Sequence, residues 1–77
     1  MHTLADLSLG DAARIVEILG EDAVAVRLME MGLTEGEEVQ LLGTAPLGDP
    51  LEFSVRGYRL SLRKAEAARV VIARPAA

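Results

Sequence analysis

The chain has 77 residues, of which 51% are hydrophobic and only 3% aromatic, and it contains no cysteine. A chain of this size buries only about 60% of the surface that it exposes when unfolded, so we expect a single domain over residues 1–77 without a deep enzyme cleft. The lack of cysteine excludes disulfides and thiolate metal sites. Because the sequence has neither a secretion signal nor an apolar run of roughly 20 residues, we expect a cytoplasmic protein without membrane insertion.

The net charge of −4 is divided unevenly along the chain. Residues 1–52 contain 11 acidic and 2 basic side chains, whereas residues 53–77 contain 1 acidic and 6 basic ones. Such an asymmetry can steer a charged partner. Nucleic acid is not the expected partner, because the base-stacking aromatic side chains and basic isoelectric point typical of nucleic-acid binding are absent.

The first predicted elements are a lead-in segment and a strand. Leu4 and Leu7 can pack onto a core before Gly10 and Asp11 turn the chain. Residues 13–19 are rich in β-branched side chains, but their alternation is broken, which predicts a strand with a β-bulge.

A helix is predicted over residues 23–31. Asp22 is a typical N-cap residue, and Val24, Leu28 and Met31 recur at helical spacing. These three side chains are therefore expected to face the core.

The end of this helix has a distinct turn pattern. With Gly32 in the left-handed conformation, the Leu33 amide can donate to the Leu28 carbonyl in a Schellman motif. The next residues, Thr34–Glu37, suit a type II turn because Gly36 tolerates a positive φ. A strand is expected to begin directly after this turn.

Short strands and turns are predicted for the remainder of the chain. They are a strand to about Thr44, a hairpin from Pro50 to Arg63 with its turn at Arg56-Gly57, one helical turn over 64–68, and a final strand at 70–72 that ends before Pro75. The connections are too short for parallel crossovers, so the sheet is predicted to be antiparallel. The expected fold is a mainly β, SH3-like barrel of about five strands with one inserted helix.

Several short motifs keep a fixed order along nearly the whole chain. They are Leu4, Leu7 and Gly10; Arg27-Leu28, Met31-Gly32-Leu33 and Gly36; residues 45–50; and Gly57, residues 60–64, Ala67, Val70 and Ile72. With this order the chain resembles FeoA-type proteins and domains of bacterial ferrous iron transport. The resemblance implies a small non-catalytic accessory that acts on the cytosolic GTPase region of the Fe(II) membrane transporter and requires no cofactor.

Two surfaces are candidates for binding that GTPase region. One is the helix surface around Arg27, Met29 and Glu30, in which Arg27 and Glu30 are one turn apart and can also pair. The other is the loop Pro46-Leu47-Gly48-Asp49, where an exposed leucine beside turn residues would provide an apolar anchor. The plainer interpretation of this loop is a hairpin connection in which Asp49 accepts from nearby amides. Assembly into a homo-oligomer is left open.

The alternative function is a metal-responsive sensor or chaperone domain that binds Fe(II) or Mn(II). Glu35, Glu37 and Glu38 are close in sequence and are weak candidates for a divalent transition-metal site, although such a cluster is more often a solvated face. His2 is the only histidine and is expected to be solvated on a mobile terminus. The sequence has neither a phosphate-binding loop nor a nucleophile with a neighbouring histidine, so we do not expect an enzyme.

Overall fold

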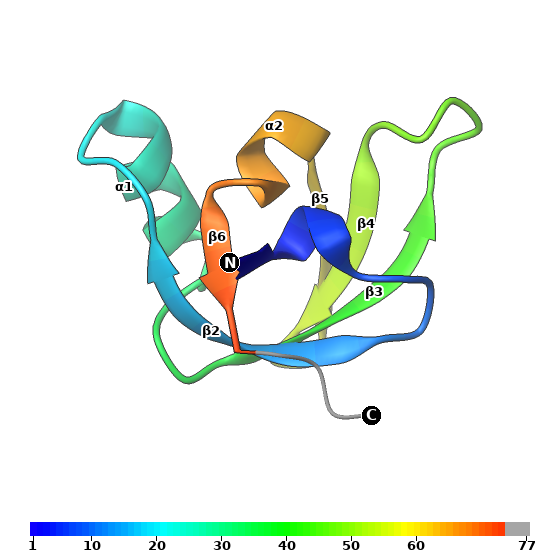
Figure 1. Cartoon of the computed structure of the whole chain (residues 1–77), viewed down its shortest axis with the longest axis horizontal. Coiled ribbons are helices and arrows are strands. Elements are labelled where there is room, and N and C mark those ends of the chain that lie inside the picture. The colour runs from blue at the N-terminus through cyan, green and yellow to red at the C-terminus, as the bar shows by residue number, and fades with distance from the viewer. Residues whose placement is uncertain (74–77) are drawn as a thin grey trace.

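The computed structural model describes residues 1–73, in which short strands alternate with turns and short helices (Figure 1). The strands are β1 (His2–Thr3), β2 (Ala12–Ile18), β3 (Glu38–Thr44), β4 (Leu51–Val55), β5 (Tyr58–Leu62) and β6 (Val70–Ile72). The helices are the 3₁₀ turn η1 (Leu4–Asp6) and the α-helices α1 (Ala23–Glu30) and α2 (Lys64–Ala67). None of the helices within residues 1–73 is long and apolar enough to cross a membrane.

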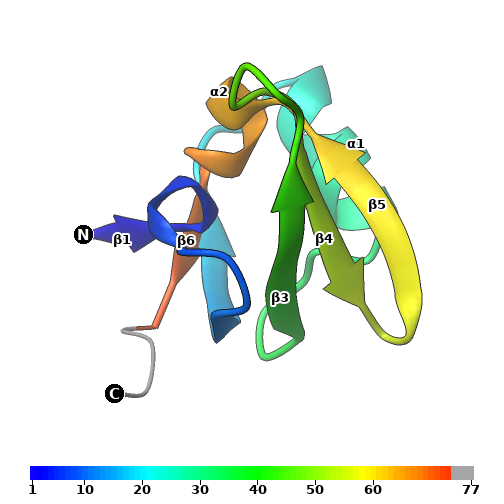
Figure 2. The ribbon, with the colours of Figure 1, turned by 90° about the vertical axis from the view of Figure 1, so that its right-hand side faces the viewer.

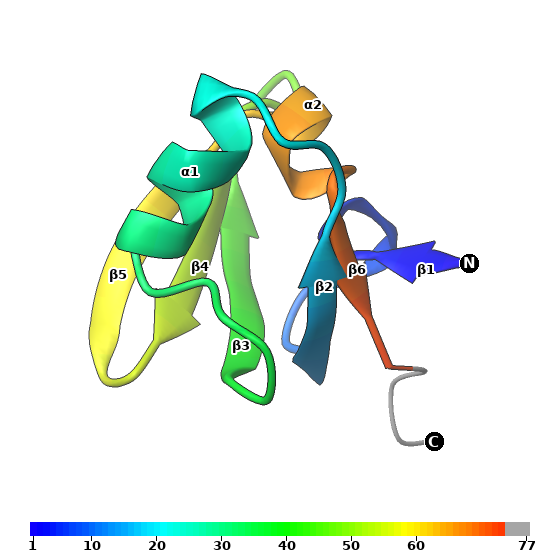
Figure 3. The same ribbon diagram turned by 90° about the vertical axis from the view of Figure 1, so that its left-hand side faces the viewer.

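All strand pairs are antiparallel, in the order β1-β6-β2-β3-β4-β5. Figures 2 and 3 show two layers, one of β1, β6 and β2 and the other of β3, β4 and β5, which the β2–β3 ladder joins. The predicted mainly β, SH3-like antiparallel fold is confirmed, with α1 inserted between β2 and β3 and α2 directly before β6.

The sheet has six strands where about five were predicted, because the prediction did not include β1. His2 pairs with Ile72 and Thr3 with Val71, so the first residues extend the edge of the sheet. A strand of two residues is too short to show alternation in a sequence. His2 was expected on a mobile terminus, but its backbone is paired in the sheet. Its side chain is exposed.

The core lies between the two layers and is almost entirely aliphatic. Phe53 is fully buried in it, and Leu4 and Leu7 pack into the same cluster as predicted. The other large members are Ile15, Leu28, Leu33, Val39, Leu41, Leu51, Val55, Leu60, Leu62, Val70 and Ile72. The lead-in segment thus covers one side of the barrel.

Two strands carry a bulge. The register of β2 against β6 shifts between Ile15 and Glu17, which confirms the bulge expected from the broken alternation in this strand. The register of β3 against β4 shifts between Leu41 and Gly43, and this second bulge was not predicted. Each bulge leaves one apolar residue, Val16 or Leu42, on the exposed side.

Candidate partner-binding surface

Helix α1 begins and packs as its sequence predicts. The Asp22 carboxylate accepts the Ala25 N–H at 3.2 Å, which caps the first turn. Leu28 is fully buried, while Val24 and Met31 are half-buried against the core. The helix ends at Glu30, one residue earlier than predicted, and Met31 is its C-cap.

The C-terminal end of α1 is a Schellman motif. Gly32 has a φ of +100°. The Leu33 N–H donates to the Leu28 carbonyl at 3.2 Å and the Gly32 N–H to the Met29 carbonyl at 3.0 Å, as this motif requires. In the following turn the Glu37 N–H donates to the Thr34 carbonyl at 3.1 Å. Both predicted features of this segment are confirmed.

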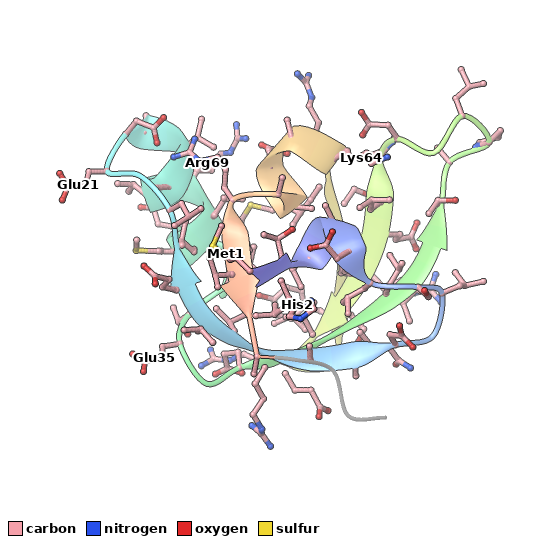
Figure 4. All side chains as sticks on the ribbon, in the orientation of Figure 1. Met1, His2, Glu21, Glu35, Lys64 and Arg69 are labelled. Atoms are coloured by element: carbon pink, nitrogen blue, oxygen red, sulfur yellow. The ribbon has the colours of Figure 1, made fainter. Side chains whose placement is uncertain are left out.

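Two distant side chains hold the ends of α1. Arg69 donates to the Leu19 carbonyl at 2.9 Å and to the Asp22 carboxylate at 2.5 Å, and Figure 4 shows it between α1 and β6. At the other end the Tyr58 hydroxyl donates to the Met31 carbonyl. These contacts fix α1 relative to the barrel, so its exposed side is a rigid platform.

The Asp22 carboxyl has a shifted pKa because of these contacts. The hydrogen bond from Arg69, and then the one from the Ala25 N–H, lower the pKa of Asp22 from 3.8 to about 2. A carboxyl whose pKa is lower in the folded state stabilises that state above its unfolded pKa, and the contribution is lost as the pH falls through the folded value. The relevant window is therefore from about pH 4 down to about pH 2.

We expect Asp22→Asn to lower the free energy of unfolding at pH 6, because asparagine can still cap the helix but cannot form the charged pair with Arg69. The difference from wild type should shrink as the pH falls toward 2, where Asp22 itself becomes protonated. Chemical denaturation of both proteins at pH 6, 3 and 2 would measure this difference. A difference that stays constant across the series would contradict the role of the charge.

The predicted helix surface is divided between two margins of α1. Arg27 is exposed and pairs with Glu66 of α2 and not with Glu30, the partner that its helical spacing allowed. Met29 is two residues further on and therefore lies about 200° away around the helix axis. Met29 is 46% exposed and Glu30 is exposed. Of the three side chains, Arg27 is the one that pairs with a residue of α2.

The loop between β3 and β4 is closed by its own backbone. The Gly48 N–H donates to the Ala45 carbonyl at 2.7 Å, and the Ala45 N–H donates to the Pro50 carbonyl at 3.0 Å. The Asp49 carboxylate accepts the Lys64 N–H at 2.9 Å, which ties the loop to α2. Leu47 is 97% exposed at the tip, so the side chain that was predicted as an anchor is available to a partner. That it contacts one stays a prediction.

A groove of about 950 Å³, open to solvent, includes one residue from each of the two predicted surfaces. Its lining includes Val24 and Arg27 of α1, Asp49 and Pro50 of the loop, and Arg63 and Glu66 at α2. Figure 1 shows α1, α2 and the tip of the β3–β4 loop along the same edge of the molecule. Sequence reasoning named Arg27 and Asp49 separately but did not bring them together, and it included Arg63 only in the count of basic residues within 53–77.

The predicted acidic cluster does not form a metal-binding group. Glu37 pairs with Arg56 at 2.6 Å, and this hydrogen bond lowers the pKa of the Glu37 carboxyl. Glu35 projects from the turn at the end of the molecule opposite Lys64 (Figure 4). Within residues 1–73 no three histidine, aspartate or glutamate side chains come together in a way that could hold a metal ion. The donor set therefore does not fit a metal at Glu35, Glu37 and Glu38.

The structure defines a small SH3-like protein of two antiparallel β-layers with an inserted helix. The family model described as the FeoA domain matches residues 2–74. The chain therefore belongs to the FeoA family, as the order of its motifs predicts.

Three proteins illustrate this relationship. The chain is 35% identical over 69 residues to the Fe(2+) transport protein A/Fe(2+) transporter FeoB fusion protein of Porphyromonas gingivalis, with 90% of this chain covered but only 8% of that relative. The crystal structure of Stenotrophomonas maltophilia FeoA complexed with zinc is 38% identical, with a TM-score of 0.84 and coverage of 95% of this chain and 91% of that one. That protein is described as a prokaryotic SH3 domain protein and is suggested as a ferrous iron transport activating factor. The NMR structure of a FeoA-like protein from Clostridium acetobutylicum is 35% identical, with a TM-score of 0.86 and coverage of 92% and 83%.

Proposed function

We propose that this chain is a non-catalytic accessory of bacterial ferrous iron uptake that binds the cytosolic GTPase region of the Fe(II) membrane transporter and so acts in the cytoplasm. The observation that carries the proposal is the P. gingivalis fusion protein, which by its name unites transport protein A and the transporter FeoB. Covalent linkage gives two modules a high effective concentration for each other. Such an arrangement suits modules that act together.

The edge that contains the groove is the surface best suited to this interaction. Leu47 is an exposed apolar side chain on a loop that is held by the Gly48–Ala45 hydrogen bond and by the Asp49 contact to α2. A rigid apolar anchor loses little conformational entropy on binding and often contributes much of the binding energy. Arg27 adds a charged group from α1 on the same edge.

An NMR titration tests this function. The isotope-labelled chain is titrated with the isolated cytosolic GTPase region of its cognate transporter, without metal. We expect localised shift changes in the β3–β4 loop and along the Arg27 margin of α1. No change at high concentrations of the GTPase region would contradict the proposed function.

We expect Leu47→Asp to abolish measurable binding to the GTPase region, because it places a charge where an apolar contact is needed. The free energy of unfolding should change by no more than about 0.5 kcal/mol, as is usual for exposed positions. Leu9→Asp is a matched control, since Leu9 is also exposed, at 69%, but lies outside the β3–β4 loop. A large loss of stability in Leu47→Asp, or equal loss of binding in both variants, would contradict the prediction.

The second candidate is the metal-responsive function, which the zinc complex of the S. maltophilia relative favours. A metal that binds only the folded chain would stabilise it by mass action. The same titration is therefore repeated with Fe(II) under anaerobic conditions. Shift changes that occur only with Fe(II) would support the metal-responsive function in place of the first.

A further inference from the structure

We infer that the groove between α1, α2 and the β3–β4 loop binds an acidic peptide segment of the transporter's cytosolic region, with Arg63 as its main charged contact. This inference rests on the proposed function and adds the chemistry of the partner. It follows from which hydrogen-bonding groups of the groove are already used within the chain and which are free.

The carboxylates of the groove are already engaged. Glu66 accepts from the Arg27 guanidinium and from the Arg63 backbone N–H, the latter at 2.8 Å. Asp49 accepts from the Lys64 backbone N–H at 2.9 Å. These bonds hold α1, α2 and the loop in place. They use both carboxylate oxygens of Glu66 and the Oδ1 of Asp49.

The free capacity of the groove is cationic. Arg63 lines the groove and Lys64 is its neighbour in the chain; both side chains are exposed, and neither bonds a carboxylate among the described residues. Arg56, Arg59 and Arg69, in contrast, each pair with an acidic side chain. Figure 4 shows Lys64 where the β3–β4 connection enters β4, at the edge that carries the groove.

A guanidinium presents its N–H donors as a planar fork, which matches the two oxygens of a carboxylate. The whole chain has a net charge of −4, so general attraction would not bring an acidic partner to it. Recognition of an acidic segment must therefore be local and must depend on Arg63. Since exposed charges act over about 10 Å at 0.1 M salt, the interaction should weaken as salt is added.

The walls of the groove indicate a second property of the ligand. Val24, Pro50 and Ala65 provide apolar surface between the charged groups, and Leu47 extends from the same loop. A segment with an apolar residue next to its acidic residue would cover this surface while its carboxylate bonds Arg63. This combination favours a peptide over a small inorganic anion.

Isothermal titration of the full chain with the isolated GTPase region tests the inference. We expect Arg63→Glu to weaken binding by about tenfold or more, as expected for the loss of a charge-assisted hydrogen bond. Arg59→Glu makes the same charge change at another exposed arginine, which pairs with Glu52 outside the groove, and should change the affinity by less than about twofold. Arg63→Lys should have an intermediate affinity, because it keeps the charge but loses the fork. Melting curves of each variant confirm that it is folded.

The outcomes separate this inference from the function on which it rests. If the wild type binds and Arg63→Glu binds equally well, the groove is not the docking site, and the proposed function stands. If Arg63→Glu and Arg59→Glu weaken binding equally, the effect is one of overall charge, and the inference is overturned. If the wild type does not bind, the proposed function fails and the inference fails with it.

Discussion

Replacing Leu28 by alanine is expected to lower the free energy of unfolding by about 2–5 kcal/mol. Leu28 is the only large side chain of α1 that is fully buried, and it lies in the same cluster as Phe53 and Leu33. Its truncation removes apolar burial and leaves a cavity where α1 meets the barrel. A chain of 77 residues has a total stability of about 4–12 kcal/mol, so a large part of it would be lost.

Two control variants make this result specific to Leu28. Val26→Ala truncates a side chain of the same helix that is 50% exposed and should cost less than about 1 kcal/mol. Leu28→Met keeps the buried volume and should cost less than about 1.5 kcal/mol. Urea denaturation of the three variants would show the order. Equal losses for Leu28→Ala and Val26→Ala would mean that α1 is not seated on the core as described.

The features that could be predicted from the sequence are those that depend on neighbours in the chain. The Asp22 cap, the Gly32-Leu33 motif and the Thr34–Glu37 turn each involve residues within five positions of one another, so their geometry follows from local conformational preference. The hairpin turn at Arg56-Gly57 belongs to the same group, since both residues have a positive φ, as a type I′ turn requires.

The features that could not be predicted join distant segments. Arg27 pairs with Glu66, 39 positions away, and Arg69 reaches Asp22, 47 positions away. Nothing in the local pattern distinguishes these partners from nearer ones such as Glu30. The candidate groove is of this kind, because it combines residues from α1, the β3–β4 loop and α2. Sequence reasoning found two of its parts but not the Arg63 that completes it.

One signal of these distant contacts is present in the glycines. Gly20 and Gly32 are the two positions where an added Cβ would collide with a side chain, that of Arg69 and that of Tyr58 respectively. Both also have a positive φ. Each position therefore favours glycine for two reasons, the room that the distant side chain needs and the backbone conformation. A glycine at each end of α1 therefore allows a distant donor to reach the backbone there.

The second large effect is expected for Gly32→Ala, which should lower the free energy of unfolding by about 2–3 kcal/mol. A φ of +100° is unfavourable for alanine, because its Cβ restricts the backbone where glycine is free. Its Cβ would also clash with the Tyr58 hydroxyl, which donates to the Met31 carbonyl, so this hydrogen bond would be lost as well. Urea denaturation measures the sum of the two costs.

Gly36→Ala separates the conformational cost from the clash. Gly36 has a similar φ of +87°, but an added Cβ there would meet no atom within 4 Å, so its substitution should cost only about 1–2 kcal/mol. In a Tyr58→Phe background the hydroxyl is absent, and Gly32→Ala should then cost about as much as Gly36→Ala. A double-mutant cycle over Gly32 and Tyr58 gives this coupling directly. If Gly32→Ala costs the same in both backgrounds, the hydroxyl contact does not hold the end of α1, and the platform beside the groove depends on packing alone.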